Sequence, residues 1–178
     1  GARVTVVEPD PARLERLDGG LLLAVGGRAL RVRTALAPSI GRALEADRPD
    51  VAIVAVKSYH TASVAGELAA AGAPSRLASF QNGIGNDRAL LDALPHSAVI
   101  AATLTTGLQI APDGSVHGRP GGGIGLAYEA GDESADALAS AFRRGGLAVR
   151  RYPDAAAMKW SKLLLNLLGS ATTALLGL

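Results

Sequence analysis

The sequence predicts an α/β fold, with a doubly wound, mainly parallel sheet followed by the first helix of an α-helical C-terminal domain. Short apolar runs alternate with helical segments from residue 4 to residue 104, the order of a sheet with right-handed crossovers. The run VAIVAV at residues 51–56 is unbroken, which is typical of a strand buried on both faces of a parallel sheet. We expect one partial domain over residues 1–153 and the start of a second over residues 154–178.

Turn and capping residues divide the chain into these elements. Pro9-Asp10-Pro11 opens a first helix, Gly26-Gly27 turns a hairpin, Ser58 can cap a helix, and Asp154 begins the last one. Helices are expected up to residue 17 and at residues 40–46, 58–71, 88–94, 134–144 and 154–178. Strands are expected at residues 4–7, 51–56, 77–80, 99–104 and 147–152, with a hairpin over 21–32. The pieces at 115–117 and 123–128 are expected to form an antiparallel addition.

Composition excludes several classes of protein. The chain has 178 residues and no cysteine, which rules out a disulfide scaffold and a thiolate zinc site. Its three histidines lack the spacing of metal ligands, so no metal site is expected. A net charge of +2 with only 3% aromatic residues gives little support to nucleic-acid binding.

The two ends of the sequence bear on its location. The chain opens on a strand pattern with no secretory signal, which favours the cytoplasm. The longest uncharged stretch, Leu163 to Leu178, is 16 residues long and carries four polar side chains, so it predicts a buried helix rather than a membrane span. There is no initiator Met, and the last residue falls within a helical pattern, so both ends look cut.

Candidate site residues follow the predicted strands. Ligands of open α/β sheets lie beyond the carboxyl ends of the strands. Those positions hold Glu8, Lys57, the Gln81–Asn86 turn and the Thr105–Gly107 turn. Glu8 could accept hydrogen bonds from ribose hydroxyls, Lys57 could reach a phosphate or carboxylate, and Gly85 allows close approach of a flat ligand. Each also has a purely structural interpretation, as a helix-start acid, a strand-end lysine and an ordinary turn.

The last helix carries a narrow polar seam. Lys162, Asn166, Ser170 and Thr173 fall within about 80° of arc at helical periodicity, and the other faces are rich in leucine. This pattern predicts a buried helix whose seam faces a cavity or a partner. An ammonium and an amide one turn apart suit a ketone oxygen and a neighbouring carboxylate or hydroxyl. The alternative is the solvent face of an amphipathic helix.

The phosphate-binding loop of a dinucleotide fold is absent from the sequence. No G-x-G-x-x-G occurs, and the glycines at 121–125 lack both its spacing and the helix that should follow. The strand that leads into such a loop would normally lie between the strands at 4–7 and 51–56. Those two strands are therefore expected about two strand spacings apart, ~9–10 Å. We interpret the chain as a fragment without its first βα unit.

These segments together resemble the ketopantoate reductase (2-dehydropantoate 2-reductase) family. The resemblance rests on VAIVAVK at 51–57, QNGIGN at 81–86, TTG at 105–107 followed by DGSVH at 113–117, and MKWSKLLLN at 158–166. Their order and spacing match the family over essentially the whole chain. The combination of Lys-Trp-x-Lys-x-x-x-Asn with Asn-Gly-x-Gly is its most specific part.

The resemblance implies a Rossmann-like dinucleotide-binding domain over 1–153 and NADPH-dependent reduction of 2-dehydropantoate to (R)-pantoate, toward pantothenate. It implies Lys162 as the general acid. Asn166 and Ser170 would bind the substrate, a small 2-keto acid. Glu8, Lys57, Asn82 and Ile110 would line the cofactor site. A homodimer is one assembly to expect, with neither a nucleic acid nor a membrane as partner.

The chain departs from the family in three ways. Family members that use NADP usually carry an arginine where this chain has Glu8-Pro9, so NAD(H) is an alternative cofactor unless Arg13 compensates. The glycine loop is missing, and the helical domain stops at its first helix, so this fragment alone should turn over little. Other hypotheses are a related 2-keto acid or imine reductase, a non-catalytic binding module and, less favoured, a membrane-associated protein.

Overall fold

The computed structural model describes residues 2–25, 28–119, 121–128 and 130–176, with side chains of the last helix described through residue 167. The strands are β1 (Thr5–Val7), β2 (Leu21–Val25), β3 (Arg28–Val32), β4 (Ala35–Ala37), β5 (Ala52–Val54), β6 (Arg76–Ser79), β7 (Ala98–Leu104), β8 (Leu108–Ile110), β9 (Val116–Gly118), β10 (Ile124–Ala127) and β11 (Val149–Tyr152). The helices are α1 (Pro11–Asp18), α2 (Ile40–Ala46), the short 3₁₀ helix η1 (Ser58–His60), α3 (Thr61–Ala71), α4 (Asn86–Ala93), α5 (Glu133–Arg144) and α6 (Ala155–Leu176).

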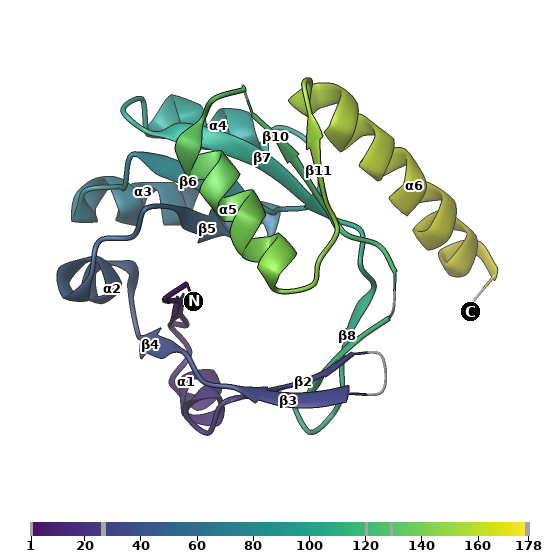
Figure 1. The fold of residues 1–178 in the computed structure, drawn as a ribbon, viewed down its shortest axis with the longest axis horizontal. Helices are drawn as coiled ribbons and strands as arrows, with labels where there is room; N and C mark the ends of the chain where they lie inside the picture. The colour runs from purple at the N-terminus through teal and green to yellow at the C-terminus, as the bar shows by residue number, and fades with distance from the viewer. Residues whose placement is uncertain (1, 26–27, 120, 129, 177–178) are drawn as a thin grey trace.

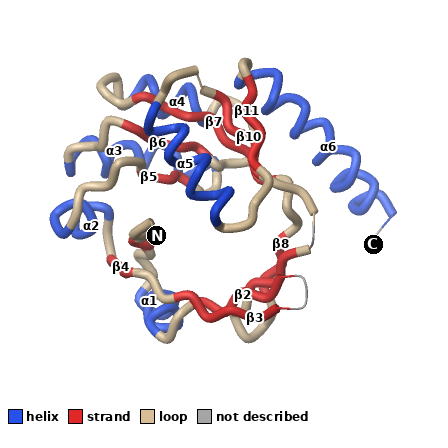
Figure 2. The backbone as a smooth tube through the Cα atoms, in the orientation of Figure 1, coloured by secondary structure: helices blue, strands red, loops and turns tan. Residues whose placement is uncertain are grey.

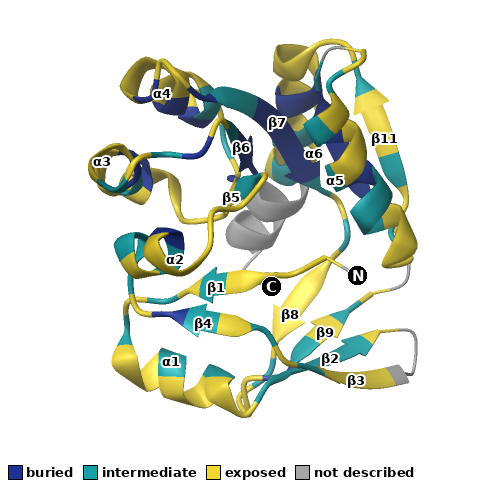
Figure 3. Cartoon of the chain, turned by 60° about the vertical axis from the view of Figure 1, so that its left-hand side comes forward, coloured by how far each residue is buried: buried dark blue, intermediate teal, exposed yellow. Residues whose placement is uncertain are grey.

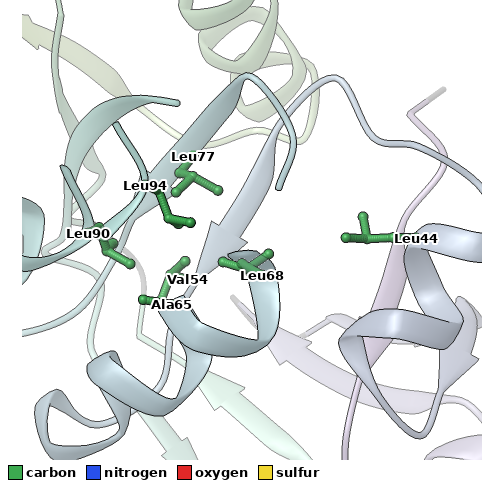
Figure 4. Close-up of a cluster of buried hydrophobic side chains, with 7 residues drawn as sticks. All are labelled: Leu44, Val54, Ala65, Leu68, Leu77, Leu90 and Leu94. Carbon is green, nitrogen blue, oxygen red and sulfur yellow. The ribbon is translucent and has the colours of Figure 1, made fainter. Parts of the chain in front are cut away.

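A five-stranded sheet of order β11-β10-β7-β6-β5 forms the centre of the fold (Figure 1). Its neighbours run parallel except β10, which is antiparallel to β7. Leucines of β6 and α4 pack with α3 on one face, where Figure 4 shows Val54, Leu77 and Leu90 close together. Alanines of α5 pack against Leu126 on the other face. Helices on both faces of a mostly parallel sheet confirm the predicted fold class.

The strands β1 and β4 form a separate two-stranded parallel sheet. Within the described residues β1 pairs only with β4, and β5 pairs only with β6, so an edge of each faces no partner strand. This is the arrangement expected when the strand between residues 4–7 and 51–56 is not in the chain. Their distance apart stays a prediction.

The prediction that residues 51–56 are buried on both faces is wrong. The strand β5 spans only Ala52–Val54, and Ile53 and Val56 are 49% and 37% exposed. Because β5 is an edge of its sheet, one face and one edge are left open in this chain. An unbroken apolar run is typical of a strand that is covered on both faces. Among the described residues, no element covers the open face of β5.

A third sheet of order β3-β2-β9-β8 lies apart from the central one, as Figure 2 shows for β2, β3 and β8. The predicted hairpin over 21–32 is present, although its turn at Gly26-Gly27 lies outside the described residues. The predicted antiparallel addition is correct only in part. The strand β10 does join β7 antiparallel, but β9 joins this third sheet, parallel to β2 and antiparallel to β8. The short strands β4 and β8 were not predicted.

The last helix, α6, begins as predicted, because Asp154 Oδ1 accepts a hydrogen bond from Ala157 N at 3.0 Å. The prediction that its leucine-rich faces are buried is wrong. Leu164 and Leu165 are 57% and 63% exposed, whereas Met158 and Lys159 are buried. Figure 3 shows exposed residues along the described part of α6. Among the described side chains of α6, the covered side is therefore the one that carries Met158, Lys159 and Lys162.

No helix in the described part of the chain combines the length and the hydropathy needed to cross a bilayer.

Candidate functional site

The carboxyl ends of β5 and β6 bring two of the predicted segments together. Val54 and Ser79 are paired in register, and Phe80 N donates to Val54 O at 2.9 Å. The loop that begins at Lys57 therefore lies beside the Gln81–Asn86 turn. The contact is direct, since Ser58 Oγ donates to Asn82 O at 3.0 Å. Ser58 was expected to cap the next helix, but its hydroxyl makes this bond and the helix start has no side-chain cap.

A buried polar network lies beneath the turn, and we call Thr61, Gln81 and Asn86 the turn network. Gln81 Nε2 donates to Thr61 Oγ1 at 2.8 Å. The Thr61 hydroxyl in turn lies 3.1 Å from Asn86 Oδ1, and Asn86 Nδ2 donates to Asn82 O at 3.0 Å. All three side chains of the network are buried. Amide and hydroxyl groups from α3, the turn and α4 thus bind one another and fix the turn's course, although Gln81 Oε1 has no donor among the described residues.

The turn leaves its outer surface open to a ligand. Asn82 is exposed, with Gly83 and Gly85 at φ +92° and +90°. Such angles favour glycine, because a side chain would be strained there. The backbone near Asn82 is therefore held from below by the turn network and free of side-chain bulk above. The close approach of a flat ligand at Gly85 stays a prediction.

The helix α6 joins this turn through Lys159. Its ammonium donates to Ser79 O at 3.2 Å and to Gln81 O at 3.1 Å, and lies 3.6 Å from Asp87 Oδ1. The side chain is only 6% exposed. Burial lowers the pKa of Lys159, and the Asp87 carboxylate partly opposes that shift. Beside it, Met158 packs on Ala101 and Ala127.

Lys162 and Asn166 lie on the same side of α6 as Lys159. Positions 159, 162 and 166 fall within about 60° of arc on a helix. Lys162 and Asn166 are partly covered, while Trp160 and Leu164 on other sides are more than half exposed. Lys162 and Asn166 thus share the covered side of α6 with Lys159, which binds the end of β6. The side chain of Ser170 lies outside the described residues.

Glu8 ends β1, as predicted, and its carboxylate is largely buried. Glu8 Oε1 accepts from Asp10 N at 3.0 Å, and Oε2 lies 3.9 Å from the Arg13 guanidinium. Arg13 Nε also lies 3.5 Å from Asp10 Oδ2. Arg13 is thus shared between two carboxylates, and the group keeps a formal charge of −1.

Two other predicted segments differ in their place relative to the turn. Thr105 is bound to Gly123, whose N donates to Thr105 Oγ1 at 2.8 Å. Ile110 is on β8 of the third sheet and is 74% exposed. The Thr105–Gly107 turn follows β7, the parallel neighbour of β6, and so leaves the same carboxyl edge as the Gln81–Asn86 turn, whereas Ile110 belongs to another sheet. Hydrogen bonds join residues 57–58, 81–87 and α6.

Sequence reasoning overlooked Lys159 and the turn network as a unit. A signal for Lys159 was present, because it is one of only three lysines and stands three residues before Lys162 on the same helix face. No comparable signal marks Thr61. Its hydrogen bond with Gln81 forms only because α3 approaches a turn 20 residues further along the chain.

A doubly wound sheet with a polar site at the joined carboxyl ends of its parallel strands defines the chain as a Rossmann-like α/β domain. The family model described as ketopantoate reductase PanE/ApbA matches residues 1–128, and the chain belongs to this family. This finding confirms the resemblance seen in the sequence.

Named relatives match nearly the whole chain. The 2-dehydropantoate 2-reductase of Halobacterium salinarum is 32% identical over 174 residues, which cover 97% of this chain and 54% of the relative. A crystal structure of 2-dehydropantoate 2-reductase from Porphyromonas gingivalis superposes with a TM-score of 0.81 at 17% identity, over 97% of this chain and 61% of that one. The enzyme of the same name from Methylococcus capsulatus gives 0.80 at 22% identity, over 97% and 56%.

These solved structures share the fold, and the relatives carry the names of oxidoreductases. The chain spans about half the length of the relatives it matches. The activity of the whole protein is therefore a matter of proposal.

Proposed function

We propose that the protein reduces 2-dehydropantoate to (R)-pantoate with NADPH, a step toward pantothenate. Its family and the 32% identical 2-dehydropantoate 2-reductase of Halobacterium salinarum support this function. The observation that carries it is the attachment of α6 to the carbonyls of Ser79 and Gln81, at the end of β6. Since Lys162 and Asn166 lie within about 60° of Lys159 on α6, we infer that they share the side that faces the turn that carries Asn82.

In the proposed reaction Lys162 acts as the general acid. When bound, the dihydronicotinamide supplies a hydride to the ketone carbon. The Lys162 ammonium hydrogen-bonds the ketone oxygen and transfers its proton there, so the product is the alcohol and Lys162 is left neutral until it regains a proton from water. Asn166, one turn further along, binds the substrate, with Ser170 beyond it. Lys57 and Asn82 contribute to the proposed site from the sheet side.

The residues present fit part of the nicotinamide dinucleotide. The Glu8 carboxylate, directly after β1, would be an acceptor for ribose hydroxyls, and the exposed Asn82 would contribute a polar side chain. The chain has no glycine loop for the pyrophosphate. Ile110 is the weakest member of this set, because it stands on another sheet.

The charge beside Glu8 bears on the choice between NADPH and NADH. A 2′-phosphate would meet Glu8 and Asp10, with Arg13 already shared between them. Like charges repel, so NADH is the alternative cofactor that the geometry supports. Ser170 stands where the family often has asparagine, which makes another 2-keto acid the alternative substrate.

The proposal includes three further points that come from the family resemblance. Residues 1–153 form the dinucleotide-binding part and 154–178 begin the helical domain. The reaction takes place in the cytoplasm, and a homodimer is the assembly to test first.

The variant Lys162→Ala of the whole protein tests this function. We expect kcat for 2-dehydropantoate to fall by about 10²–10⁴-fold, because the general acid is lost. The Kd of the reduced cofactor should change less than about twofold, since Lys162 acts on the substrate oxygen. The control is Arg88→Met, which removes an exposed cation from α4.

Equal kcat in Lys162→Ala and wild type would overturn the role of Lys162. Failure of the wild type to reduce any 2-keto acid while binding a nicotinamide cofactor would favour a non-catalytic binding module.

A further inference from the structure

We propose that Lys159 is a positioning residue that fixes the peptide bond between Gln81 and Asn82 relative to Lys162. This inference rests on the proposed function for its catalytic meaning, and on contacts of this chain for its geometry. Lys159 differs from Lys162 in burial and in partners, and no feature of the sequence resemblance assigns it a role.

The burial of Lys159 requires compensating contacts. An ammonium withdrawn from water is unfavourable unless it is paired and hydrogen-bonded. Lys159 meets this requirement with two main-chain carbonyls and one carboxylate, all from the end of β6, the turn and α4. Its ammonium is therefore engaged with the protein and is not a free proton donor like the one proposed at position 162.

The carbonyl of Gln81 gives the contact its specific consequence. That carbonyl and the amide N of Asn82 belong to one planar peptide unit. A hydrogen bond that fixes the carbonyl therefore also fixes the orientation of the Asn82 N–H and the position of its Cα atom. Lys159 Nζ holds this carbonyl at 3.1 Å from one side. On the other side of the turn, Asn86 Nδ2 and Ser58 Oγ both donate to Asn82 O at 3.0 Å. The Asn82 backbone is thus held at both ends.

The same contact sets the position of Lys162. It stands three residues after Lys159, and three residues of helix advance about 4.5 Å along the axis. Met158 packs on Ala101 and Ala127 next to Lys159, so α6 cannot rotate there without breaking both the packing and the ammonium contacts. Lys159 therefore couples the helix that carries the proposed acid to the peptide that carries Asn82.

The ammonium lies beside a carboxylate oxygen that has no other partner. Asp87 Oδ1, 3.6 Å from Lys159 Nζ, is buried and lacks a hydrogen-bond donor among the described residues. The removal of the ammonium would leave Asp87 without its cation and the Gln81 carbonyl without a donor.

The experiment compares three variants of the whole protein. Lys159→Met removes the ammonium and keeps much of its length. The double variant Lys159→Met/Asp87→Leu removes both charges, which should recover stability but not the bond to Gln81 O. Arg88→Met, which removes an exposed cation paired with Asp92 on the same helix as Asp87, is the matched control.

Two readouts separate positioning from stability. The first is the ¹⁵N–¹H shift of the Asn82 and Gly83 amides without any cofactor. The second is the split between kcat and KM for the keto acid, measured with the melting temperature. In both Lys159 variants we expect displaced Asn82 and Gly83 amides and a fall in kcat of about tenfold to a hundredfold, from misplacement of the reacting groups. Arg88→Met should match the wild type.

Chemical rescue adds a further check. The chain contains no cysteine, so Lys159→Cys introduces the only thiol of these 178 residues. Alkylation of the unfolded protein with 2-bromoethylamine, followed by refolding, restores an ammonium at nearly the length of lysine. We expect this product, and not the carbamidomethylated one, to recover the wild-type amide shifts.

The outcomes are distinct. Displaced amides together with low kcat in the stable double variant support the proposal. Wild-type amide shifts or full kcat in that variant would overturn it and make Lys159 a matter of stability alone. If the wild type has no reductase activity, the proposed function fails, and the amide shifts and their rescue still decide whether Lys159 fixes the turn.

Discussion

Two polar clusters in this chain are held together in different ways. The turn network and Lys159 join residues 20 to 80 positions apart, from α3, β6, α4 and α6. The second cluster, at the β8–β9 connection, consists of Asp113, Ser115 and His117. There Ser115 Oγ lies 2.6 Å from Asp113 Oδ1 and 2.9 Å from His117 Nε2, all within five residues.

The difference teaches how to separate a site from a turn. An Asp-x-Ser pair that bonds its own backbone is ordinary turn chemistry, even with a histidine beside it. A network that joins four distant elements fixes their relative positions, and any ligand at that edge depends on it. The reach of the contacts, rather than the residue types, marks the turn network as the functional candidate.

The first prediction compares the stability of the two clusters. Asn86→Ala should lower the free energy of unfolding by about 2–3 kcal/mol, because buried partners in three segments lose hydrogen bonds. Ser115→Ala should cost about 0.5–1.5 kcal/mol, because Asp113 still accepts Ser115 N at 2.9 Å. Urea unfolding of both variants measures the two costs.

Ser115→Ala has a second readout. The hydrogen bond from Ser115 lowers the pKa of Asp113, so loss of the hydroxyl should bring that pKa back toward its usual value. Equal destabilisation by the two variants would remove the distinction between the clusters.

The second prediction tests how far packing, in addition to Lys159, attaches α6. A Cβ at Gly125 on β10 would lie 2.9 Å from Met158 Sδ and 2.9 Å from Thr103 Cγ2. Gly125→Ala should therefore cost about 1–3 kcal/mol by overpacking and displace α6. Thermal unfolding measures the cost. Gly66→Ala, on an exposed position of α3 with nothing within 4 Å, is the control and should stabilise the protein slightly. A neutral Gly125→Ala would mean that α6 does not rest on β10.

The third prediction concerns the cofactor. Glu8→Ser should raise the ratio of kcat/KM for NADPH to that for NADH by about tenfold, because the carboxylate that repels a 2′-phosphate is removed. Steady-state kinetics with both cofactors measures the ratio, with Glu15→Ser on the exposed side of α1 as the control. An unchanged ratio would place the cofactor ribose elsewhere.

The fourth prediction is a pH dependence. The folded-state pKa of Lys159 is below its ordinary value of 10.5, chiefly through burial, so between those two values the unfolded chain binds more protons than the folded one. The contribution of Lys159 to the free energy of unfolding therefore rises with pH between those two pKa values. Below both values this contribution does not change with pH.

The measurement is the difference in unfolding free energy between wild type and Lys159→Met from pH 7 to pH 10. We expect the wild type to gain relative to the variant as the pH rises, by up to about 1.4 kcal/mol per unit of pKa difference. A flat or falling difference would show that the ammonium is not disfavoured by its burial.

Much of the fold could be predicted from local pattern. The helices at 40–46 and 134–144 begin within one residue of expectation, because Ser39 and Asp132 supply N-terminal caps to periodic sequences. The strands β4 and β8 were not predicted. Each has three residues, and a strand this short shows no detectable alternation of apolar and polar residues. The parallel pairing of β9 with β2 depends on residues about 90 positions apart, which no local signal reports.

The candidate site was predictable in its parts and not in its assembly. The rule that ligands lie beyond the carboxyl ends of parallel strands selected Lys57 and Asn82. Helical periodicity selected Lys162 and Asn166. Periodicity also predicted that the leucines of α6 face inward, and the opposite face is the one that meets the sheet. A helix pattern shows which residues share a face, but the surface against which the helix packs decides which face is covered. In this chain the contacts of Lys159 with the end of β6 decide it.

The transfer of a single deuterium tests the central claim most directly. The whole protein is given 2-dehydropantoate and a reduced nicotinamide cofactor deuterated at the transferred position, and the product is examined by mass spectrometry. We expect pantoate with one deuterium at C2 from the wild type and from Arg88→Met, and at least about 10²-fold slower labelling from Lys162→Ala. If the wild type yields no deuterated pantoate, the result would contradict a reductase site at the carboxyl edge of this sheet. Equal labelling rates from the wild type and Lys162→Ala would contradict it as well.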